Sequence, residues 1–337
     1  MLAVLVLLAA CSDDGDDESS GDTTTTTVDL ADTEPRPSPG CGAAATDLAA
    51  GEERVTMESG GHERWYIRHV PPAHDGGRPV PLVVDVHGYS EGAEIHVAQT
   101  RLGPYGDEEG FLTVSPQGQG EVAWWDTEEG SADLAFIGNL LDHVEETACV
   151  DEARIFVTGL SNGAMMTSSI ACTYADRVAA VAPVAGLRRP EWCDPSAAVP
   201  LMAFHGTADP FVAHDGGLGP ATADLPAPDG SGRTLGDIGV GPGDDEPSIP
   251  DLAAAWAQGN GCEGEPVEED VASDVTRMTF PCPVPGDVFL FRVQDGGHTW
   301  PGSEFSRSIE AITGHTTFSI DANELIWAFF QDHPRPA

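Results

Sequence analysis

Two short stretches of the sequence carry a serine in the pattern Gly-x-Ser-x-Gly, which is typical of a sharp turn that exposes a nucleophilic side chain. They read GYSEG at Gly88–Gly92 and GLSNG at Gly159–Gly163. The second stretch follows the apolar run RIFVT and precedes AMMTSSIAC, so a buried strand and a buried helix can flank its serine. The first is followed by the more polar AEIHVAQT. We therefore predict that Ser161, in the second stretch, is the nucleophile.

The GYSEG stretch has a different predicted use. It continues the run VVDVH, so His87-Gly88 stands just after an early strand. A loop in that place often donates a backbone N–H to the negative oxygen of a tetrahedral intermediate. We predict that the N–H of Tyr89 is one such donor and that the N–H of Asn162, next to the nucleophile, is the other.

A serine nucleophile needs a base and a carboxylate that orients it. His298 lies in the glycine-rich QDGGHTWPG, between a strong strand and the last helix, and Asp209 ends the turn after the strand LMAFH. We predict these two as base and carboxylate. Asp215 and Asp295 remain alternatives for the carboxylate. The chain order serine, aspartate, histidine is that of the α/β-hydrolases.

Three tryptophans lie close to these motifs. Trp300 is two residues from His298, and Trp124 precedes Trp125 in the run VAWWD. We predict that Trp124 and Trp300 contact the substrate, although core packing is an equal interpretation for Trp125.

The elements that must position these residues alternate between strands and helices. Continuous apolar runs, typical of strands buried on both faces of a parallel sheet, occur at 64–70, 82–87, 111–115, 154–158, 178–185, 201–205 and 288–293. Helical spacing of apolar residues follows at 131–148, after the second serine motif, and at 322–333. This alternation predicts an α/β fold with a mostly parallel sheet and helices on both faces. Residues 211–250 break the alternation and are either a lid or a tolerated surface insertion.

The charge of the chain excludes one class of partner. Its 15 basic residues, all arginine, stand against 56 acidic residues, which gives a net charge of −41. Such a surface repels nucleic acid and anionic lipid headgroups, so we expect no nucleic-acid partner.

The first forty residues indicate export. Residues 1–11, MLAVLVLLAAC, are an apolar run too short to span a bilayer, and they end in a pattern similar to a bacterial lipobox. We predict lipidation at Cys11, with an ordinary signal peptide as the alternative. Residues 12–40 are acidic and rich in threonine and proline, which predicts a disordered tether before a catalytic domain at 41–337. The protein would then be extracellular and touch the membrane only through its lipid anchor.

Six further cysteines predict three disulfides, because an even number in an exported protein is typical of a disulfide framework. They are Cys41, Cys149, Cys172, Cys193, Cys262 and Cys282. Spacing alone leaves 15 possible pairings open. None of the spacings is typical of a zinc site, so we predict no metal.

Taken together, these stretches resemble the extracellular polyhydroxybutyrate depolymerase and feruloyl esterase family. The similar segments are PLVVDVHG, SPQG, CVDEARIFVTGLSNGAMM, AFHGTADP, WAQGNGC and GGHTWPG, which span most of residues 41–337. The resemblance implies an α/β-hydrolase fold, the Ser161–Asp209–His298 triad, and the pairs Cys41–Cys149, Cys172–Cys193 and Cys262–Cys282. Two features depart from the family: Tyr89 follows His-Gly where a cysteine is frequent, and the 211–250 insertion is longer and more acidic.

We therefore predict an extracellular serine esterase that cleaves polyester or oligoester bonds through an acyl-enzyme and needs no cofactor. A feruloyl or acetyl-xylan esterase acting on plant cell-wall polysaccharide is the alternative within the same chemistry. The alternative of another class is a non-catalytic surface protein that binds its ligand on a hydrolase scaffold.

Overall fold

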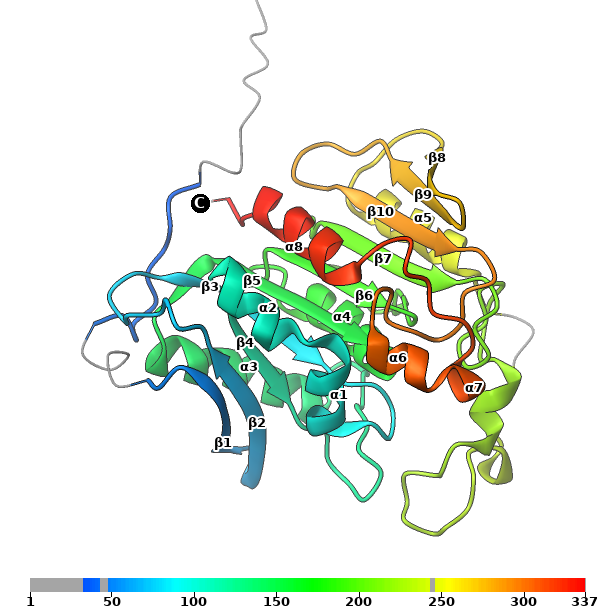
Figure 1. Cartoon of the computed structure of the whole chain (residues 1–337), viewed down its shortest axis with the longest axis horizontal. Coiled ribbons are helices and arrows are strands. Elements are labelled where there is room, and N and C mark those ends of the chain that lie inside the picture. The colour runs from blue at the N-terminus through cyan, green and yellow to red at the C-terminus, as the bar shows by residue number, and fades with distance from the viewer. Residues whose placement is uncertain (1–32, 43–47, 243–245, 337) are drawn as a thin grey trace, which may run out of the picture.

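One large sheet organises the chain. The computed structural model describes residues 33–42, 48–242 and 246–336. The predicted lipidation residue Cys11 and the tether up to residue 32 lie outside these ranges. Ten strands form a single sheet in the order β1-β2-β4-β3-β5-β6-β7-β10-β9-β8 (Figure 1).

The strands and helices have the following bounds. The strands are β1 (Gly51–Ser59), β2 (His62–Val70), β3 (Val80–Val86), β4 (Leu112–Pro116), β5 (Val150–Leu160), β6 (Ala180–Val184), β7 (Leu201–Gly206), β8 (Val267–Ala272), β9 (Val275–Phe280) and β10 (Val288–Val293). The helices are α1 (Gly92–Thr100), α2 (Leu102–Glu109), α3 (Ala132–Thr147), α4 (Asn162–Thr173), α5 (Ile249–Gly259), α6 (Glu304–Ser308), α7 (Glu310–Thr313) and α8 (Ala322–Asp332).

The centre of the sheet is parallel and its edges are antiparallel. Strands β4, β3, β5, β6, β7 and β10 all run in one direction. Strands β2 and β1 continue one edge in antiparallel fashion, as β9 and β8 do at the other. The prediction of a mostly parallel sheet is confirmed, and each of the seven predicted runs forms a strand. The loops that follow the parallel strands therefore all emerge on the same side, at the carboxyl ends of these strands.

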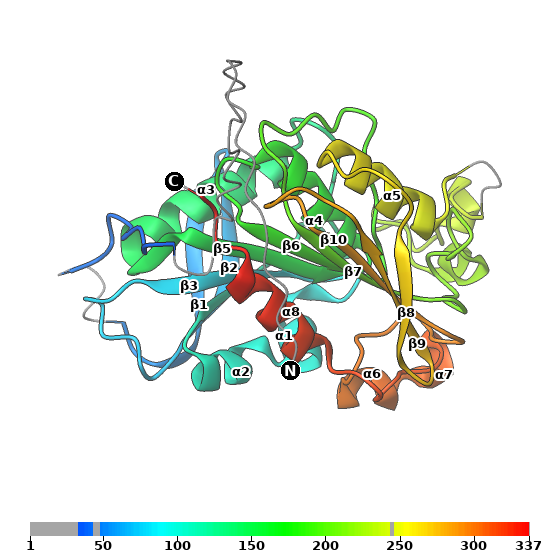
Figure 2. The ribbon, with the colours of Figure 1, turned by 90° about the horizontal axis from the view of Figure 1, so that it is seen from above.

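Helices cover both faces, as predicted. Figure 2 shows α3, α4 and α5 on one face and α1, α2 and α8 on the other. Two apolar layers result. One contains Leu140 of α3 and Trp256 of α5, and the other contains Trp327 and Phe330 of α8. Phe330 stacks on Phe156 of β5 with ring centroids 4.5 Å apart, which fixes α8 against the centre of the sheet.

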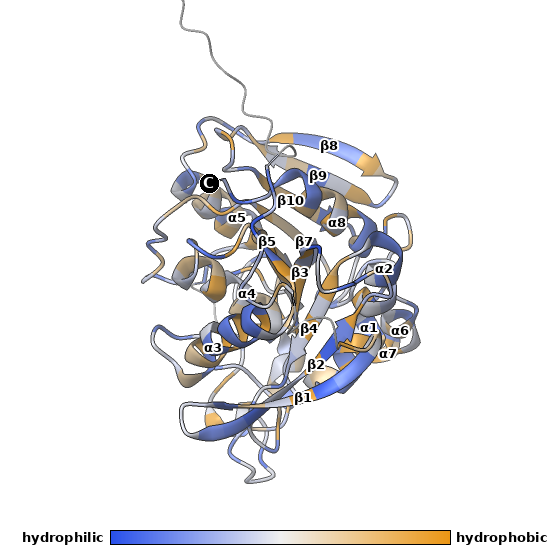
Figure 3. Ribbon diagram, turned by 90° about the vertical axis from the view of Figure 1, so that its left-hand side faces the viewer, coloured by the Kyte–Doolittle hydropathy of each residue, from blue (hydrophilic) through white to orange (hydrophobic). Residues whose placement is uncertain are grey.

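The sequence did not predict the strands β1, β8 and β9, which lie at or next to the edges of the sheet. β8 carries Glu268, Glu269 and Asp270 and is exposed along most of its length. Figure 3 shows hydrophilic stretches in β1 and β8, in contrast to the apolar central strands. Charged edge strands hinder pairing with another chain, and the same charges hide them from a search for apolar runs.

The last residues of the predicted tether pack against the folded part of the chain. The Ser38 hydroxyl donates to the carbonyl of Ala148 at 2.8 Å, and the Gly40 N–H donates to the carbonyl of Glu145 at 2.7 Å. A Cβ on Gly40 would lie 2.4 Å from the Ala148 carbonyl oxygen, so this close contact requires glycine. Ser38 and Gly40, in the last part of the predicted tether, are thus held against the chain around Glu145 and Ala148.

Three disulfides lie in the described part of the chain, and one of them joins cysteines 108 residues apart while the other two join cysteines 21 and 20 residues apart. They are Cys41–Cys149, Cys172–Cys193 and Cys262–Cys282, the pairs that the family resemblance implied. Among the described residues, no helix combines the length and apolar character that crossing a bilayer requires.

Candidate active site

Ser161 occupies a strained turn between a strand and a helix. Leu160 ends β5 and Asn162 begins α4, which leaves Ser161 alone between them with φ 59° and ψ −122°. A Cβ on Gly159 or Gly163 would lie 2.5 Å and 2.0 Å, respectively, from the carbonyl oxygen of Val86. Both glycines of the motif are thus required by the neighbouring strand β3. A non-glycine residue in such a conformation is costly and is typical of a functional site.

The GYSEG stretch is also followed by a helix, which the sequence analysis did not anticipate. Ser90 has φ 59° as well, so neither a following helix nor a strained serine distinguishes the two motifs. The spacing does distinguish them: residues 87–91 separate β3 from α1, whereas a single residue separates β5 from α4. GYSEG is therefore a loop, as its predicted role requires.

His298 and Asp209 meet at the carboxyl ends of the parallel strands. Asp209 follows β7 and His298 follows β10, and these two strands are neighbours. Nδ1 of His298 lies 2.7 Å from Oδ2 of Asp209, and both residues are buried. The other oxygen, Oδ1, accepts the N–H groups of Phe211 at 2.8 Å and Val212 at 3.0 Å. The carboxylate is thus held rigidly and leaves Nε2 of His298 for the substrate side.

Electrostatics keep Asp209 ionised. Burial opposes ionisation, but the charge and hydrogen bond of His298, together with nearby His205, hold the pKa of Asp209 below its ordinary value. Burial lowers the pKa of His205, which places this histidine in the neutral state with Nε2 2.9 Å from the Val212 carbonyl. His205 is a structural support of the turn, in agreement with its predicted position at a strand end.

The alternative carboxylates lie elsewhere. Asp215 is exposed and contacts His214 at 3.0 Å. Asp295 is exposed too, and its N–H donates to Thr207 at 2.8 Å. Neither is hydrogen-bonded to His298.

The nucleophile, the base and the GYSEG loop all line one cavity of about 270 Å³. Ser161 and His298 both line it, and so do Gly88 and Tyr89 of the GYSEG loop. Its remaining wall is mostly apolar and comes from Ile95, Leu160, Phe211, Leu225, Phe305, Ile309 and Ile312. Sequence reasoning missed these apolar residues, since no motif marks them and they come from five separate segments. Phe211 and Leu225 belong to the 211–250 insertion, which therefore forms part of the cavity wall.

The predicted oxyanion donors flank Ser161. A Cβ on Gly88 would lie 3.4 Å from the Cβ of Ser161, so the GYSEG loop passes directly beside the serine. The N–H of Tyr89 has no hydrogen-bond partner among the described residues. The Asn162 N–H lies at the start of α4, where N–H groups lack helical acceptors. The Asn162 side chain accepts the Trp125 N–H at 2.7 Å, which fixes this residue.

The predicted substrate contacts of the tryptophans do not fit this geometry. Trp300 is 1% exposed, and its indole N–H donates to Asn323 at 3.0 Å. Trp124 is half-buried, and neither Trp124 nor Trp300 lines the cavity around Ser161. The proximity of Trp300 to His298 in sequence misled the prediction, because the backbone turns the indole into the core. Trp125 is also buried, which agrees with its interpretation as a packing residue.

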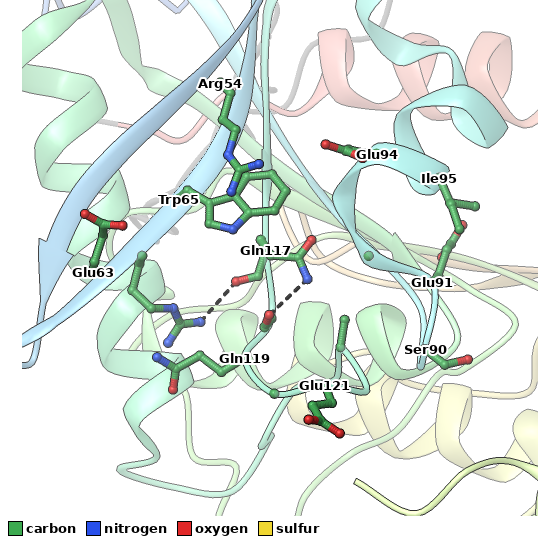
Figure 4. Close-up of a pocket in the computed structure, with 15 residues that line it drawn as sticks. Arg54, Glu63, Trp65, Ser90, Glu91, Glu94, Ile95, Gln117, Gln119 and Glu121 are labelled. Carbon is green, nitrogen blue, oxygen red and sulfur yellow. Dashed lines mark hydrogen bonds between the residues drawn. The ribbon is translucent and has the colours of Figure 1, made fainter. Parts of the chain in front are cut away.

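A second, more polar depression of about 580 Å³ adjoins the cavity. Figure 4 shows Ser90, Glu91 and Ile95 in the lining of this depression, and the same three residues also line the cavity. On its far side, the guanidinium of Arg54 lies 3.6 Å from the ring centre of Trp65. A ligand that projects from the cavity can therefore continue over this polar surface.

The fold and the site together define an α/β-hydrolase. The chain belongs to the Esterase PHB depolymerase family, whose profile matches residues 65–221, and it is a carboxylic ester hydrolase. It is 30% identical over 264 residues to "Putative esterase NocK" of Nocardia uniformis subsp. tsuyamanensis, with 73% of each chain covered.

Two further comparisons agree with this result, one in sequence and one in fold. Feruloyl esterase C of Emericella nidulans is 30% identical over 187 residues, which are 54% of this chain and 65% of that protein, slightly under two thirds. The solved structure of an acetyl xylan esterase from Aspergillus awamori matches with a TM-score of 0.59 at 14% identity, over 84% of this chain and 100% of that one. At that identity the match supports the fold alone.

Proposed function

We propose that the protein is an exported serine esterase in which Ser161, His298 and Asp209 form the catalytic triad. One observation carries the proposal. Ser161, at its strained turn, lines the same cavity as His298, and Nδ1 of this histidine is held by the buried carboxylate of Asp209. A histidine base oriented by a carboxylate activates a serine hydroxyl in the same way in several unrelated hydrolase folds.

The chemistry follows from these positions. His298 Nε2 takes the proton of the Ser161 hydroxyl as its oxygen attacks the ester carbonyl. The N–H groups of Tyr89 and Asn162 stabilise the oxygen that becomes negative. His298 returns the proton to the leaving alcohol as the C–O bond breaks, and the acyl-enzyme remains. His298 then deprotonates a water molecule, which attacks the acyl carbon. As the bond from that carbon to Ser161 Oγ breaks, His298 returns the proton to Oγ, and the acid and the free serine are released.

The proposed substrate is a polyester or oligoester of short hydroxy acids. Membership of the depolymerase family supports this class, and the mostly apolar cavity of about 270 Å³ suits one short acyl unit. The polar depression beside it supports the second candidate, an ester of a cell-wall polysaccharide whose sugar would extend over Gln117 and Gln119.

One assay distinguishes these candidates. The protein is incubated with polyhydroxybutyrate and, in parallel, with methyl ferulate, and released hydroxybutyrate and ferulate are quantified against a Ser161→Ala control. We expect hydroxybutyrate to predominate. Predominant ferulate would assign the protein to the feruloyl esterases instead.

Export is part of the same proposal. Three disulfides are typical of proteins that fold in an oxidising compartment. We propose that Cys11 carries the lipid that anchors the protein to the outer face of the membrane. A Cys11→Ala variant should appear in the culture medium, whereas the unaltered protein should partition with membranes. Equal partitioning of both would refute the anchor.

A further inference from the structure

An ionic cluster that the mechanism above does not use joins Glu91 of the GYSEG loop to the fully buried pair His96 and Asp85. His96 of α1 is 0% exposed, and its Nε2 lies 2.7 Å from Oδ1 of Asp85. Its Nδ1 lies 3.2 Å from Oε2 of Glu91. Thr100 donates its hydroxyl to the other oxygen of Asp85 at 2.7 Å. One imidazole thus links strand β3 to the loop that precedes α1.

The cluster is charged at neutral pH. Burial alone would lower the pKa of His96, but the carboxylates of Asp85 and Glu91 outweigh it and raise that pKa to about 10. Burial likewise opposes ionisation of Glu91, and the charge and hydrogen bond of His96 hold its pKa below the ordinary value. Two carboxylates around one imidazolium leave little orientational freedom, because separating any of these charges in the interior is strongly unfavourable.

Glu91 transmits this rigidity to the backbone of the loop. Its Oε2 accepts the Gly88 N–H at 2.6 Å. The carbonyl of Gly88 accepts from Nδ1 of His87 at 2.7 Å and from the Glu91 N–H at 3.4 Å. A peptide group is planar and trans, so fixing the Gly88 carbonyl fixes the direction of the Tyr89 N–H, which points the opposite way.

His87 can make this contact only as a donor at Nδ1, and the structure favours that form. Burial lowers the pKa of His87 to about 4, so the ring is neutral. Nε2 accepts the Gly118 N–H at 2.9 Å, which leaves the proton on Nδ1. Both sides of the Gly88 residue are therefore held by side chains. Figure 4 shows Ser90 and Glu91 in the loop leading into α1.

We propose that Glu91, held by the His96–Asp85 pair, is a positioning residue: it holds the N–H side of Gly88 while His87 holds the Gly88 carbonyl, and the two together aim the Tyr89 N–H at the developing oxyanion. The proposal rests on the function proposed above, because it assigns Glu91 a part in the same ester hydrolysis. Glu91 acts through the backbone of Gly88 and touches no reacting atom.

Two substitutions of Glu91 separate positioning from a purely structural ion pair. Glu91→Gln removes the charge but keeps an oxygen at the right reach, and the single oxygen Oε2 already serves both the Gly88 N–H and His96. Glu91→Asp keeps the buried charge but withdraws the carboxylate from the Gly88 N–H. If Glu91 positions the loop, its side chain must be long enough to contact the Gly88 N–H, so the glutamine variant should be the more active of the two. A structural ion pair requires charge, so it predicts the reverse order.

The measurements are kcat and KM for a p-nitrophenyl ester, and Ki for a trifluoromethyl ketone that forms an oxyanion on the nucleophile. We expect Glu91→Asp to lower kcat by about 10²-fold, the usual effect of losing one oxyanion donor, with KM within about threefold. Ki should weaken in parallel with kcat. Glu91→Gln should stay within about tenfold of the unaltered protein, which is well inside the effect expected for a lost donor.

A matched control is Glu109→Asp, since Glu109 also accepts a hydrogen bond, from the Trp327 indole at 2.9 Å, and does not line the cavity. It should leave kcat and Ki unchanged. The inference is overturned if Glu91→Asp retains full kcat or exceeds Glu91→Gln. An active Ser161→Ala variant would instead overturn the proposed function, so the two failures are distinguishable.

Discussion

At the scale of single residues, the site depends on a few atoms held by backbone contacts. Asp209 receives two N–H groups on one oxygen and His298 on the other, so its carboxylate cannot rotate without losing them. Sequence reasoning selected both residues because each stands in a turn after an apolar strand, and the structure places them in contact. It could not identify Glu91 or His96, since their importance comes from contacts made in the fold, around the buried His96 and the GYSEG loop, and not from any motif.

The substitution Asp209→Asn should test the role of this carboxylate. The amide can still bond to His298, but it removes the negative charge that stabilises the imidazolium and favours the wrong tautomer. We expect kcat to fall by about 10³–10⁴-fold, as in other triads, with little change in KM. Asp215→Asn serves as the matched control in steady-state kinetics and should behave like the unaltered protein. A loss confined to Asp215→Asn would reassign the carboxylate.

His96 should make stability depend on pH in the alkaline range. Its pKa is raised in the folded protein to about 10 from an ordinary value of 6.5, so folding favours the protonated form. This contribution is fully present below about pH 6.5 and is lost as the pH rises toward 10. The free energy of unfolding, from urea titrations at several pH values, should therefore decline over that range, and less steeply in His96→Gln. Equal slopes would contradict the charged cluster.

At the scale of secondary structure, apolar runs revealed the central strands but not the edges. The runs between 64 and 293 are visible because both faces of those strands are buried. β1 and β8 face solvent, and their glutamates follow no simple alternation. Helix α1 was missed for a related reason: its buried residues include His96, Gln99 and Thr100, which are polar and are satisfied by hydrogen bonds that no sequence pattern records.

The segment at 33–42 should contribute to stability through its disulfide. Cys41–Cys149 closes a stretch with a sequence separation of 108 residues, and Ser38 and Gly40 add hydrogen bonds beside it. We expect the double variant Cys41→Ser/Cys149→Ser to lose about 2–5 kcal/mol of unfolding free energy, as is typical when a native disulfide is removed from a small secreted domain. Activity at low temperature should persist, because the disulfide lies far from Ser161 in the fold. An unchanged denaturant midpoint would show that the segment is only loosely attached.

At the scale of the whole molecule, charge is the dominant feature. A net charge of −41 with no lysine creates self-repulsion in the compact state, which salt screens. The net charge follows from composition alone, and the fold does not change it. The overall α/β architecture was equally predictable, whereas the cavity wall was not, because its residues come together only in three dimensions.

We expect the melting temperature to rise with ionic strength. A screening gain of about 1 kcal/mol would raise Tm by about 2–4 °C for a domain of this size. Calorimetry in 0.05–1 M sodium chloride would measure it, with the Glu91→Gln variant as a check that the buried cluster is not responsible. A Tm that is constant or falls across this range would show that the surface charge does not limit stability.

The central claim is that Ser161, and not Ser90, is the nucleophile. The most direct measurement is covalent labelling by a fluorophosphonate, with ester hydrolysis followed in parallel, for the unaltered protein and the variants Ser161→Ala and Ser90→Ala. Our account predicts that Ser161→Ala neither labels nor hydrolyses although it unfolds at the same temperature, and that Ser90→Ala labels normally. Labelling of Ser161→Ala, or its loss in Ser90→Ala alone, would contradict it.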